Sequence, residues 1–359
     1  MVKVGVIGCG YWGPNLIRNF RSTPNCEMVI CCDKDQDRLK RMQTLHPGIQ
    51  TTTNHEELLK MDIDAVVIAT PVWTHYPLAK AFLNAGKHVF IEKPITPSSK
   101  ECQELIELAE SKKRVLMVGH TFEYTAPVNK IKELIDSGEI GEVMYISSTR
   151  VNLGLFQTDI NVIWDLAPHD ISIISYILGK QPVSVSAQGK DHYRAGIEDV
   201  AMTTLNYENG TIAFLHNSWL DPNKVRKMVF VGTKKMLVYD DTSPNEKIKI
   251  YDKGVDKPSY YNNFGEFQFS YRYGDIYIPR IEDYEALGKE TAHFVDCILN
   301  NQTPRSDGYS GLRVVKVLEA SSASLKQNGL AISLEPLDQI ESKTDNAGLS
   351  TFYENRKTG

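Results

Sequence analysis

The glycine-rich segment Gly8-Cys9-Gly10-Tyr11-Trp12-Gly13 constrains the fold of this chain more than any other feature. It follows the β-branched run Val2–Ile7 and precedes an amphipathic stretch over 14–21. In this G-x-G-x-x-G order, the first glycine permits a tight turn, the second lets a pyrophosphate approach the backbone, and the third lets helix and strand pack closely. The helix N-terminus then faces the negative charge. The segment predicts a dinucleotide-binding loop, and a glycine turn without a ligand is the alternative. The expected cofactor contacts are Gly8, Gly10, Tyr11, Trp12 and Gly13.

An acid ends the second predicted strand. Asp33 follows the run 28–32 and lies 20 residues after Gly13. At this distance a carboxylate hydrogen-bonds the adenosine ribose hydroxyls and repels a 2′-phosphate, which favours NAD over NADP. Lys34 and Arg38 lie close enough to serve a phosphate, so NADP stays open as the cofactor. A solvated strand-end carboxylate is the structural alternative for Asp33.

Short apolar runs alternate with amphipathic stretches through the first third of the chain. The runs at 28–32, 65–69, 88–91 and 115–118 predict strands, and the stretches at 36–45, 76–85 and 98–111 predict helices. Such alternation is typical of an α/β fold with right-handed crossovers between parallel strands. We therefore expect a Rossmann-type, doubly wound parallel sheet over residues 1–124.

The pattern changes after Tyr124. Strands are predicted at 143–150, 200–207, 211–219, 225–231 and 236–239, and helices at 128–137, after Pro168, at 284–299 and at 308–327. Asn209-Gly210 predicts a hairpin turn between two of these strands. Residues 125–335 should thus form an α+β domain on a large open, mainly antiparallel sheet, followed by a polar C-terminal tail at 336–359. One face of this open sheet is expected to be covered, either by a substrate or by a second subunit.

The length and composition of the chain limit the classes of function that it can have. A chain of 359 residues predicts two domains, and 42% hydrophobic residues suffice for a large core without a metal or disulfides. The net charge of −5 and the absence of a long Lys/Arg run argue against nucleic acid or a membrane surface as partner. The six cysteines lack zinc-ligand spacing and are expected to be reduced. The opening MVKVGVIGCG is unlike a signal peptide and no membrane-length apolar run is found, so we expect a cytoplasmic protein.

Two further segments carry groups suited to proton transfer. Ile91-Glu92-Lys93-Pro94 ends a strand at the edge where ligands bind such sheets, so Lys93 should face the cofactor. A partly desolvated lysine at this position could lower the pKa of a neighbouring hydroxyl group. The segment 164–170 places His169 between two acids, and an imidazole can take a proton from an alcohol as hydride leaves. The structural alternatives are a surface lysine, helix-capping acids and an interdomain histidine.

Taken together, these motifs resemble the glucose-fructose oxidoreductase / inositol dehydrogenase / rhizopine-catabolism family of NAD(P)-dependent oxidoreductases. Three motifs carry the resemblance, in the expected order: the loop 8–13, Glu92-Lys93-Pro94, and Asp165-x-x-x-His169. The resemblance covers about residues 1–335. It implies a Rossmann domain, then an open-sheet domain that commonly packs against another subunit in homodimers or homotetramers.

The resemblance also implies roles for individual residues. Lys93 corresponds to the catalytic-site lysine, His169 to the acid/base at the substrate hydroxyl, and Asp165 to the carboxylate that orients or assists the histidine. Cofactor contacts are implied for the loop 70–75 and for the segment 119–122 at the nicotinamide end. From these motifs the expected additional cofactor contacts are Thr70, Pro71, His75, Glu92, Lys93 and His120. The expected substrate contacts are Lys93, Tyr124, Arg150, Trp164, Asp165 and His169.

Within the family, the segments 10–15, 164–170 and 308–312 look most like the nucleotide-sugar branch. That branch oxidises or reduces the 3-position of UDP- or dTDP-linked sugars, and its diphosphate calls for Arg or Lys, for which Lys130, Arg150 and Arg280 are candidates. A dehydrogenase of a free polyol such as an inositol would share the same central residues. A dinucleotide-sensing regulator without turnover is a further alternative, although sensing needs no proton-transfer group.

Overall fold

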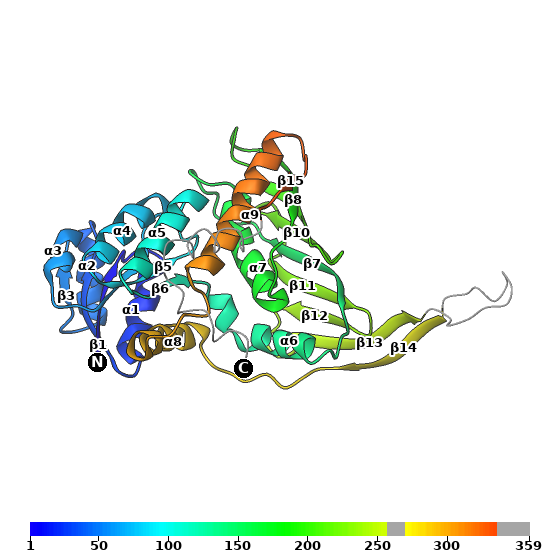
Figure 1. The fold of residues 1–359 in the computed structure, drawn as a ribbon, viewed down its shortest axis with the longest axis horizontal. Coiled ribbons are helices and arrows are strands. Elements are labelled where there is room, and N and C mark those ends of the chain that lie inside the picture. The colour runs from blue at the N-terminus through cyan, green and yellow to red at the C-terminus, as the bar shows by residue number, and fades with distance from the viewer. Residues whose placement is uncertain (257–269, 336–359) are drawn as a thin grey trace.

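The fold consists of two β-sheets with helices packed around them (Figure 1). The computed structural model describes residues 1–256 and 270–335. The predicted tail at 336–359 lies outside the described residues.

The N-terminal sheet has six strands in the order β3-β2-β1-β4-β5-β6, and all their pairings are parallel. The strands are β1 (Val2–Ile7), β2 (Cys26–Cys32), β3 (Gln50–Thr52), β4 (Ala65–Ile68), β5 (His88–Glu92) and β6 (Leu116–Gly119). The helices are α1 (Gly13–Ser22), α2 (Gln36–Leu45), α3 (His55–Lys60), α4 (His75–Asn84) and α5 (Ser99–Ser111). This order is that of the Rossmann fold and confirms the predicted doubly wound sheet. The short elements β3 and α3 were not among the predicted ones.

The second sheet has nine strands in the order β14-β13-β12-β11-β7-β10-β9-β8-β15. Only β7 and β10 pair in parallel, so the predicted mainly antiparallel sheet is confirmed. The strands are β7 (Val143–Val151), β8 (Ser184–Lys190), β9 (Val200–Asn206), β10 (Ile212–Ser218), β11 (Val225–Gly232), β12 (Met236–Asp240), β13 (Ile248–Asp256), β14 (Ser270–Tyr277) and β15 (Ile332–Ser333). The helices are α6 (Ala126–Asp136), α7 (Val162–Leu178), α8 (Ala286–Asn300) and α9 (Gly308–Lys326). Helices α6, α7 and α9 lie on one side of this sheet (Figure 1).

Helix α7 begins earlier than predicted. It starts at Val162 and contains Pro168, whereas the sequence analysis placed its start after that proline. Asn161 caps the helix, because its side-chain oxygen accepts the backbone N–H of Trp164 at 3.2 Å. The earlier start places Asp165 and His169 one turn apart on the same side of the helix.

The C-terminal helices tie the two halves together. Helix α8 returns to the N-terminal half, where the Phe294 ring meets the rings of Phe20 and Phe90 edge-on at 6.1 and 5.6 Å. The backbone carbonyl of Ser306, just before α9, accepts the Val118 N–H of β6 at 2.8 Å. The segment between β14 and α9 therefore contacts the N-terminal half and connects it to the second sheet.

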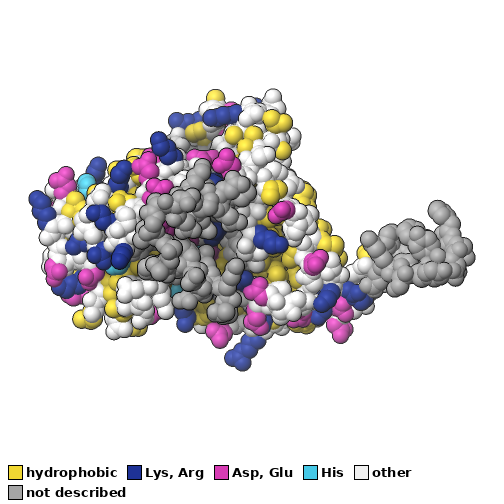
Figure 2. Space-filling view, viewed as in Figure 1, with side chains coloured by type: hydrophobic (Ala, Val, Ile, Leu, Met, Phe, Trp, Pro, Cys, Tyr) yellow, Lys and Arg dark blue, Asp and Glu magenta, His cyan; other side chains and the backbone are white. Residues whose placement is uncertain are grey.

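The side of the nine-stranded sheet away from α7 exposes large apolar side chains. Tyr145, Met202 and Phe214 are exposed on three neighbouring strands, whereas Ile146, Ala201, Thr203, Ala213 and Leu215 beside them are buried. Charged side chains of both signs are mixed over the face drawn in Figure 2. No helix in the described part of the chain is long and apolar enough to cross a membrane. All six cysteines are free thiols.

Candidate active site

The three glycines of the loop between β1 and α1 differ in the space around them. A Cβ at Gly8, whose φ is +99°, would lie 2.4 Å from the Ala69 carbonyl oxygen, and one at Gly13 would lie 2.0 Å from the Gly8 carbonyl oxygen. A Cβ at Gly10 would meet only the Arg38 guanidinium, at 3.5 Å. Gly8 and Gly13 are therefore required by the fold itself, whereas the space over Gly10 is open. An open backbone before an uncapped helix N-terminus suits a pyrophosphate.

The Asp33 carboxylate, the expected ribose-binding acid, lies beneath this loop. It accepts the backbone N–H of Cys9 at 2.7 Å and that of Asp35 at 2.9 Å. The Arg38 guanidinium is 3.5 Å away and Lys34 is exposed. The carboxylate is thus fixed in orientation by two backbone donors before any ligand arrives.

Buried polar groups lie near the ends of β1, β5 and β6. Trp12 and Glu92 lie within hydrogen-bonding reach of each other, whereas both ring nitrogens of His120 have no hydrogen-bond partner among the described residues. Burial raises the pKa of Glu92 to about 7 and lowers that of His120 to about 3. A buried polar group left without a partner costs about 1–3 kcal/mol, so the His120 ring calls for a polar ligand. Its position at the carboxyl edge of the sheet fits the nicotinamide end of a bound NAD.

The segment after β4 is linked to the Lys93 segment by a buried histidine. His75 Nε2 lies 2.7 Å from the Thr70 carbonyl oxygen, and His75 Nδ1 lies 2.9 Å from that of Pro94. Because each ring nitrogen lies against a backbone carbonyl, the His75 side chain connects the loop after β4 with the loop after β5. Pro71 and Tyr11 are exposed at the loop surfaces, where they are accessible to a bound cofactor.

A cavity of about 200 Å³ lies between the two sheets at this edge. Its lining comes from the end of β5, from β7, from α7 and from the start of β11. The lining residues are Lys93, Arg150, Val151, Asn152, Asp165, Leu166, His169, Lys224 and Arg226. The structure thus brings together four of the predicted substrate contacts: Lys93, Arg150, Asp165 and His169.

This environment lowers the pKa values of both Lys93 and His169. The Lys93 ammonium donates to the backbone carbonyl of Asp165 at 3.1 Å, and burial lowers its pKa. Burial, followed by the positive charges of Lys93 and Arg150, holds the pKa of His169 well below its usual range. The imidazole is therefore neutral near pH 7 and able to accept a proton. Its ring packs edge-on against Phe122 with 5.1 Å between the ring centres.

The two acids of the α7 segment have other partners than the histidine. Asp165 Oδ2 accepts the indole N–H of Trp219 at 2.9 Å, and no hydrogen bond joins it to His169 in the described chain. Asp170 and Arg150 form a buried ion pair with an N–O distance of 2.7 Å. The role implied for Asp165, to orient the imidazole directly, is therefore not seen in this geometry. Asp165 instead places Lys93 through its backbone carbonyl.

Other candidates from the sequence lie outside the cavity. The Tyr124 hydroxyl is buried 3.1 Å from Ser306 Oγ, and the Trp164 indole donates to Ser322 Oγ at 2.9 Å. Lys130 pairs with Glu133 on the surface of α6, and Arg280 is exposed after β14. Asn152, Lys224 and Arg226 line the cavity but were not predicted from the sequence. Arg226 is placed there by the pairing of β11 with β7, and Asn152 and Lys224 lie next to the paired ends of these strands.

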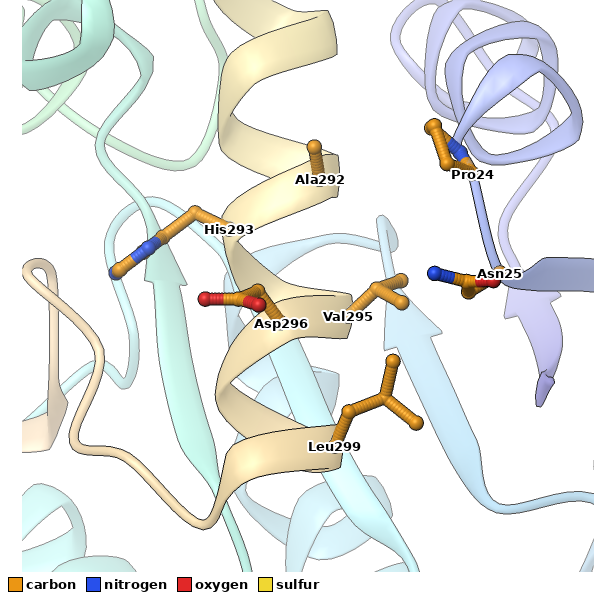
Figure 3. A pocket seen from close by; sticks show the side chains of 7 residues that line it. All are labelled: Pro24, Asn25, Ala292, His293, Val295, Asp296 and Leu299. Carbon is orange, nitrogen blue, oxygen red and sulfur yellow. The ribbon is translucent and has the colours of Figure 1, made fainter.

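A larger cavity of about 360 Å³ lies between α8 and the turn after α1, away from these residues (Figure 3). It is lined by Pro24, Asn25, Ala292, His293, Val295, Asp296 and Leu299. Its only ionisable groups are His293 and Asp296, and the His293 ring already accepts the Arg305 backbone N–H at 3.0 Å. Although it is larger, this cavity lacks the set of proton-transfer groups that the interdomain cavity has.

Two family models match the chain. Residues 2–120 match the oxidoreductase family with an NAD-binding Rossmann fold, and residues 128–238 match the GFO/IDH/MocA C-terminal domain. The open loop at Gly10 and the unpartnered ring nitrogens of His120 agree with this NAD-binding assignment.

Full-length relatives and a solved structure agree with these matches. The chain is 27% identical to the oxidoreductase YrbE of Bacillus subtilis, over 94% of this chain and 98% of that protein. It is 24% identical to myo-inositol 2-dehydrogenase of Thermotoga maritima, over 91% and 97% of the two chains. A UDP-N-acetylglucosamine 3-dehydrogenase from Acidithiobacillus ferrooxidans superimposes with a TM-score of 0.74 at 25% identity, covering 90% of this chain and 98% of that one. This chain belongs to the GFO/IDH/MocA family of NAD-binding oxidoreductases.

Proposed function

We propose that this enzyme transfers a hydride between NAD and the 3-position carbon of a nucleotide-linked sugar. The observation that carries the proposal is one small cavity that combines the neutral His169 imidazole and the Lys93 ammonium with further cationic side chains. Alcohol oxidation needs the first two groups, and a phosphorylated substrate needs the others. The similarity to a UDP-N-acetylglucosamine 3-dehydrogenase supports the choice of substrate.

The residues divide the work in the direction of oxidation. Bound NAD supplies the hydride acceptor. His169 takes the proton of the reacting hydroxyl, and its lowered pKa keeps the ring ready for that step. Lys93, held by the Asp165 carbonyl, donates to the same oxygen and stabilises its developing charge. In the direction of reduction, Lys93 polarises the carbonyl oxygen and protonated His169 returns the proton.

The second candidate is a dehydrogenase of a free polyol, which the similarity to myo-inositol 2-dehydrogenase favours. The two candidates share His169 and Lys93 and differ in the need for phosphate-binding cations. Turnover of UDP- or dTDP-sugars without turnover of inositols supports the nucleotide-sugar proposal. Turnover of inositols alone would replace it with the polyol dehydrogenase.

Substitution of the proposed base tests the catalytic assignment. His169→Asn should lower kcat for hydride transfer by about 100-fold or more, since general acid–base catalysis contributes about that much. Calorimetry should show an unchanged affinity for NAD, because His169 lies on α7 in the second half of the chain and is not part of the glycine loop. Near wild-type turnover by His169→Asn would refute the acid/base role.

We also propose that the outward face around Tyr145, Met202 and Phe214 forms a homodimer or homotetramer interface. Three large apolar side chains on adjoining strands gain from being covered. Sedimentation should show a dimer or tetramer that Phe214→Glu dissociates, whereas Leu45→Glu at the exposed end of α2 should not. A wild-type monomer at micromolar concentration would contradict this interface.

A further inference from the structure

The lining of the interdomain cavity is unbalanced in charge. Its ionisable residues are four cations and one acid besides the histidine: Lys93, Arg150, Lys224, Arg226 and Asp165. Deeper charges offset part of this excess, since Asp170 pairs with Arg150 and Glu92 lies close to Lys93. What remains without a full partner is the pair Lys224 and Arg226 at the start of β11.

Strand pairing places two arginines side by side at this point. Arg150 of β7 and Arg226 of β11 are directly opposite each other in an antiparallel ladder, so their side chains leave the same face of the sheet. Like charges in this position destabilise a sheet. Asp170 already pairs with Arg150, so Arg226 is the arginine of this pair that a bound anion would stabilise.

Arg226 has only a weak partner. Its guanidinium lies 3.4 Å from Asp241, and the same carboxylate lies 3.5 Å from the Lys247 ammonium. One acid is therefore shared by two cations. Lys224 is exposed and forms no ion pair within residues 1–256 and 270–335.

We propose that Lys224 and Arg226 bind an anionic group of the substrate, a carboxylate or a phosphate, next to the carbon on which His169 acts. The inference rests on the proposed function and specifies its substrate class as an acidic one. The charge belongs either to a carboxylate on the sugar ring or to the diphosphate of the nucleotide. Arginine presents a planar fork of donors that matches both groups, and Lys224 adds a point charge at the cavity mouth.

The cavity size places this anion close to the reacting carbon. About 200 Å³ is smaller than the roughly 300–1,000 Å³ of a whole ligand pocket, so the enclosed space holds only part of a nucleotide sugar. The same cavity includes His169, Lys93 and Arg226. A group bound by Arg226 is therefore a direct neighbour of the ring that reacts.

The test compares matched substrates and matched variants. The substrates are UDP-N-acetylglucosamine, the same compound with a carboxylate at its 6-position, and free N-acetylglucosamine, each with NAD. The variants are Lys224→Gln, the double variant K224Q/R226Q, and the control Lys227→Gln. Lys227 is an exposed residue of β11 whose side chain leaves the opposite face from that of Arg226. Binding of each compound to the NADH-loaded enzyme is also measured by calorimetry, which does not depend on turnover.

The double variant should lose about tenfold or more in kcat/KM and in affinity for the anionic substrate, and the control should lose less than twofold. If the loss is confined to the 6-carboxylate compound, the anion is on the ring. If it is equal for both nucleotide sugars and absent for the free sugar, the anion is the diphosphate. Lys224→Gln alone, at an exposed position, should show part of the loss with an unchanged unfolding temperature.

Two results separate failure of the inference from failure of the proposed function. Nucleotide-sugar turnover that K224Q/R226Q leaves within twofold of wild type would overturn the anion site and leave the function standing. Turnover of inositols with no binding of either nucleotide sugar would overturn the proposed function. In that case equal affinity of wild type for glucose and for glucuronate would overturn the anion site as well.

Discussion

The geometry of the glycine loop separates binding of NAD from folding of the loop. A methyl group at Gly10 meets only the far end of the Arg38 side chain, at 3.5 Å, and the φ of Gly10 is outside the left-handed region. Gly10→Ala should therefore change the free energy of unfolding of the ligand-free protein by no more than about 0.5 kcal/mol. For a chain of this size that shift moves the unfolding temperature by about 2 °C at most.

The same methyl group occupies the space over the loop that the pyrophosphate needs. Loss of a single charge-assisted hydrogen bond from backbone N–H to phosphate costs about 1.5–3 kcal/mol. Since about 1.4 kcal/mol is a factor of ten, Gly10→Ala should raise the Kd for NAD at least about tenfold. Isothermal titration calorimetry measures this Kd, and thermal unfolding without ligand measures the stability.

Gly13→Ala is the matched control, because its methyl group would lie 2.0 Å from the Gly8 carbonyl oxygen. Backbone must move to relieve that overlap, at a cost of about 1–3 kcal/mol. The ligand-free variant should thus unfold several degrees lower than Gly10→Ala. The reasoning is refuted if Gly10→Ala keeps its NAD affinity within twofold, or if it is destabilised as much as Gly13→Ala.

Three other perturbations have defined outcomes. Asp33→Asn should raise kcat/KM with NADP relative to NAD by about tenfold, because it removes a charge that repels a 2′-phosphate; an unchanged ratio would contradict that role. Asp170→Asn should lower the free energy of unfolding by about 3–5 kcal/mol, since it leaves the buried Arg150 charge unpaired. Asp136→Asn, which breaks an exposed pair, should cost less than about 1 kcal/mol in the same denaturant titration. Because the pKa of His169 is lowered, its base form persists as pH falls, so kcat/KM for oxidation should stay on its plateau at pH 6.5 and decline only below it. A decline centred at or above pH 6.5 would contradict the assignment of His169.

The sequence predicted the parts of the fold that local patterns determine. The alternation of buried strands and amphipathic helices was enough for five of the six strands of the N-terminal sheet, all but β3. Asn209-Gly210 was enough for the hairpin of β9 and β10. The predicted start of α7 is wrong, because Pro168 lies inside the helix and does not begin it. The capping bond from Asn161 and the packing of the helix outweigh the single backbone bond that a proline removes.

Part of the cavity lining could be predicted from the sequence and part could not. Lys93 and His169 stand in short motifs, whereas Arg226 is identified only by its place opposite Arg150 in the sheet. Tyr124 and Trp164 look equally suited to a substrate in sequence. Their hydroxyl and indole groups instead bond to Ser306 and Ser322, which are more than 150 residues away in the chain.

Transfer of an isotopic label tests the central proposal most directly. UDP-N-acetylglucosamine carrying deuterium on carbon 3 is incubated with the enzyme and NAD, and the reduced cofactor is analysed by mass spectrometry. The proposed function predicts one deuterium in the nicotinamide ring, and none with the His169→Asn variant over the same time. Reduced cofactor without deuterium, or reduction only by an inositol labelled at its reacting carbon, would contradict it.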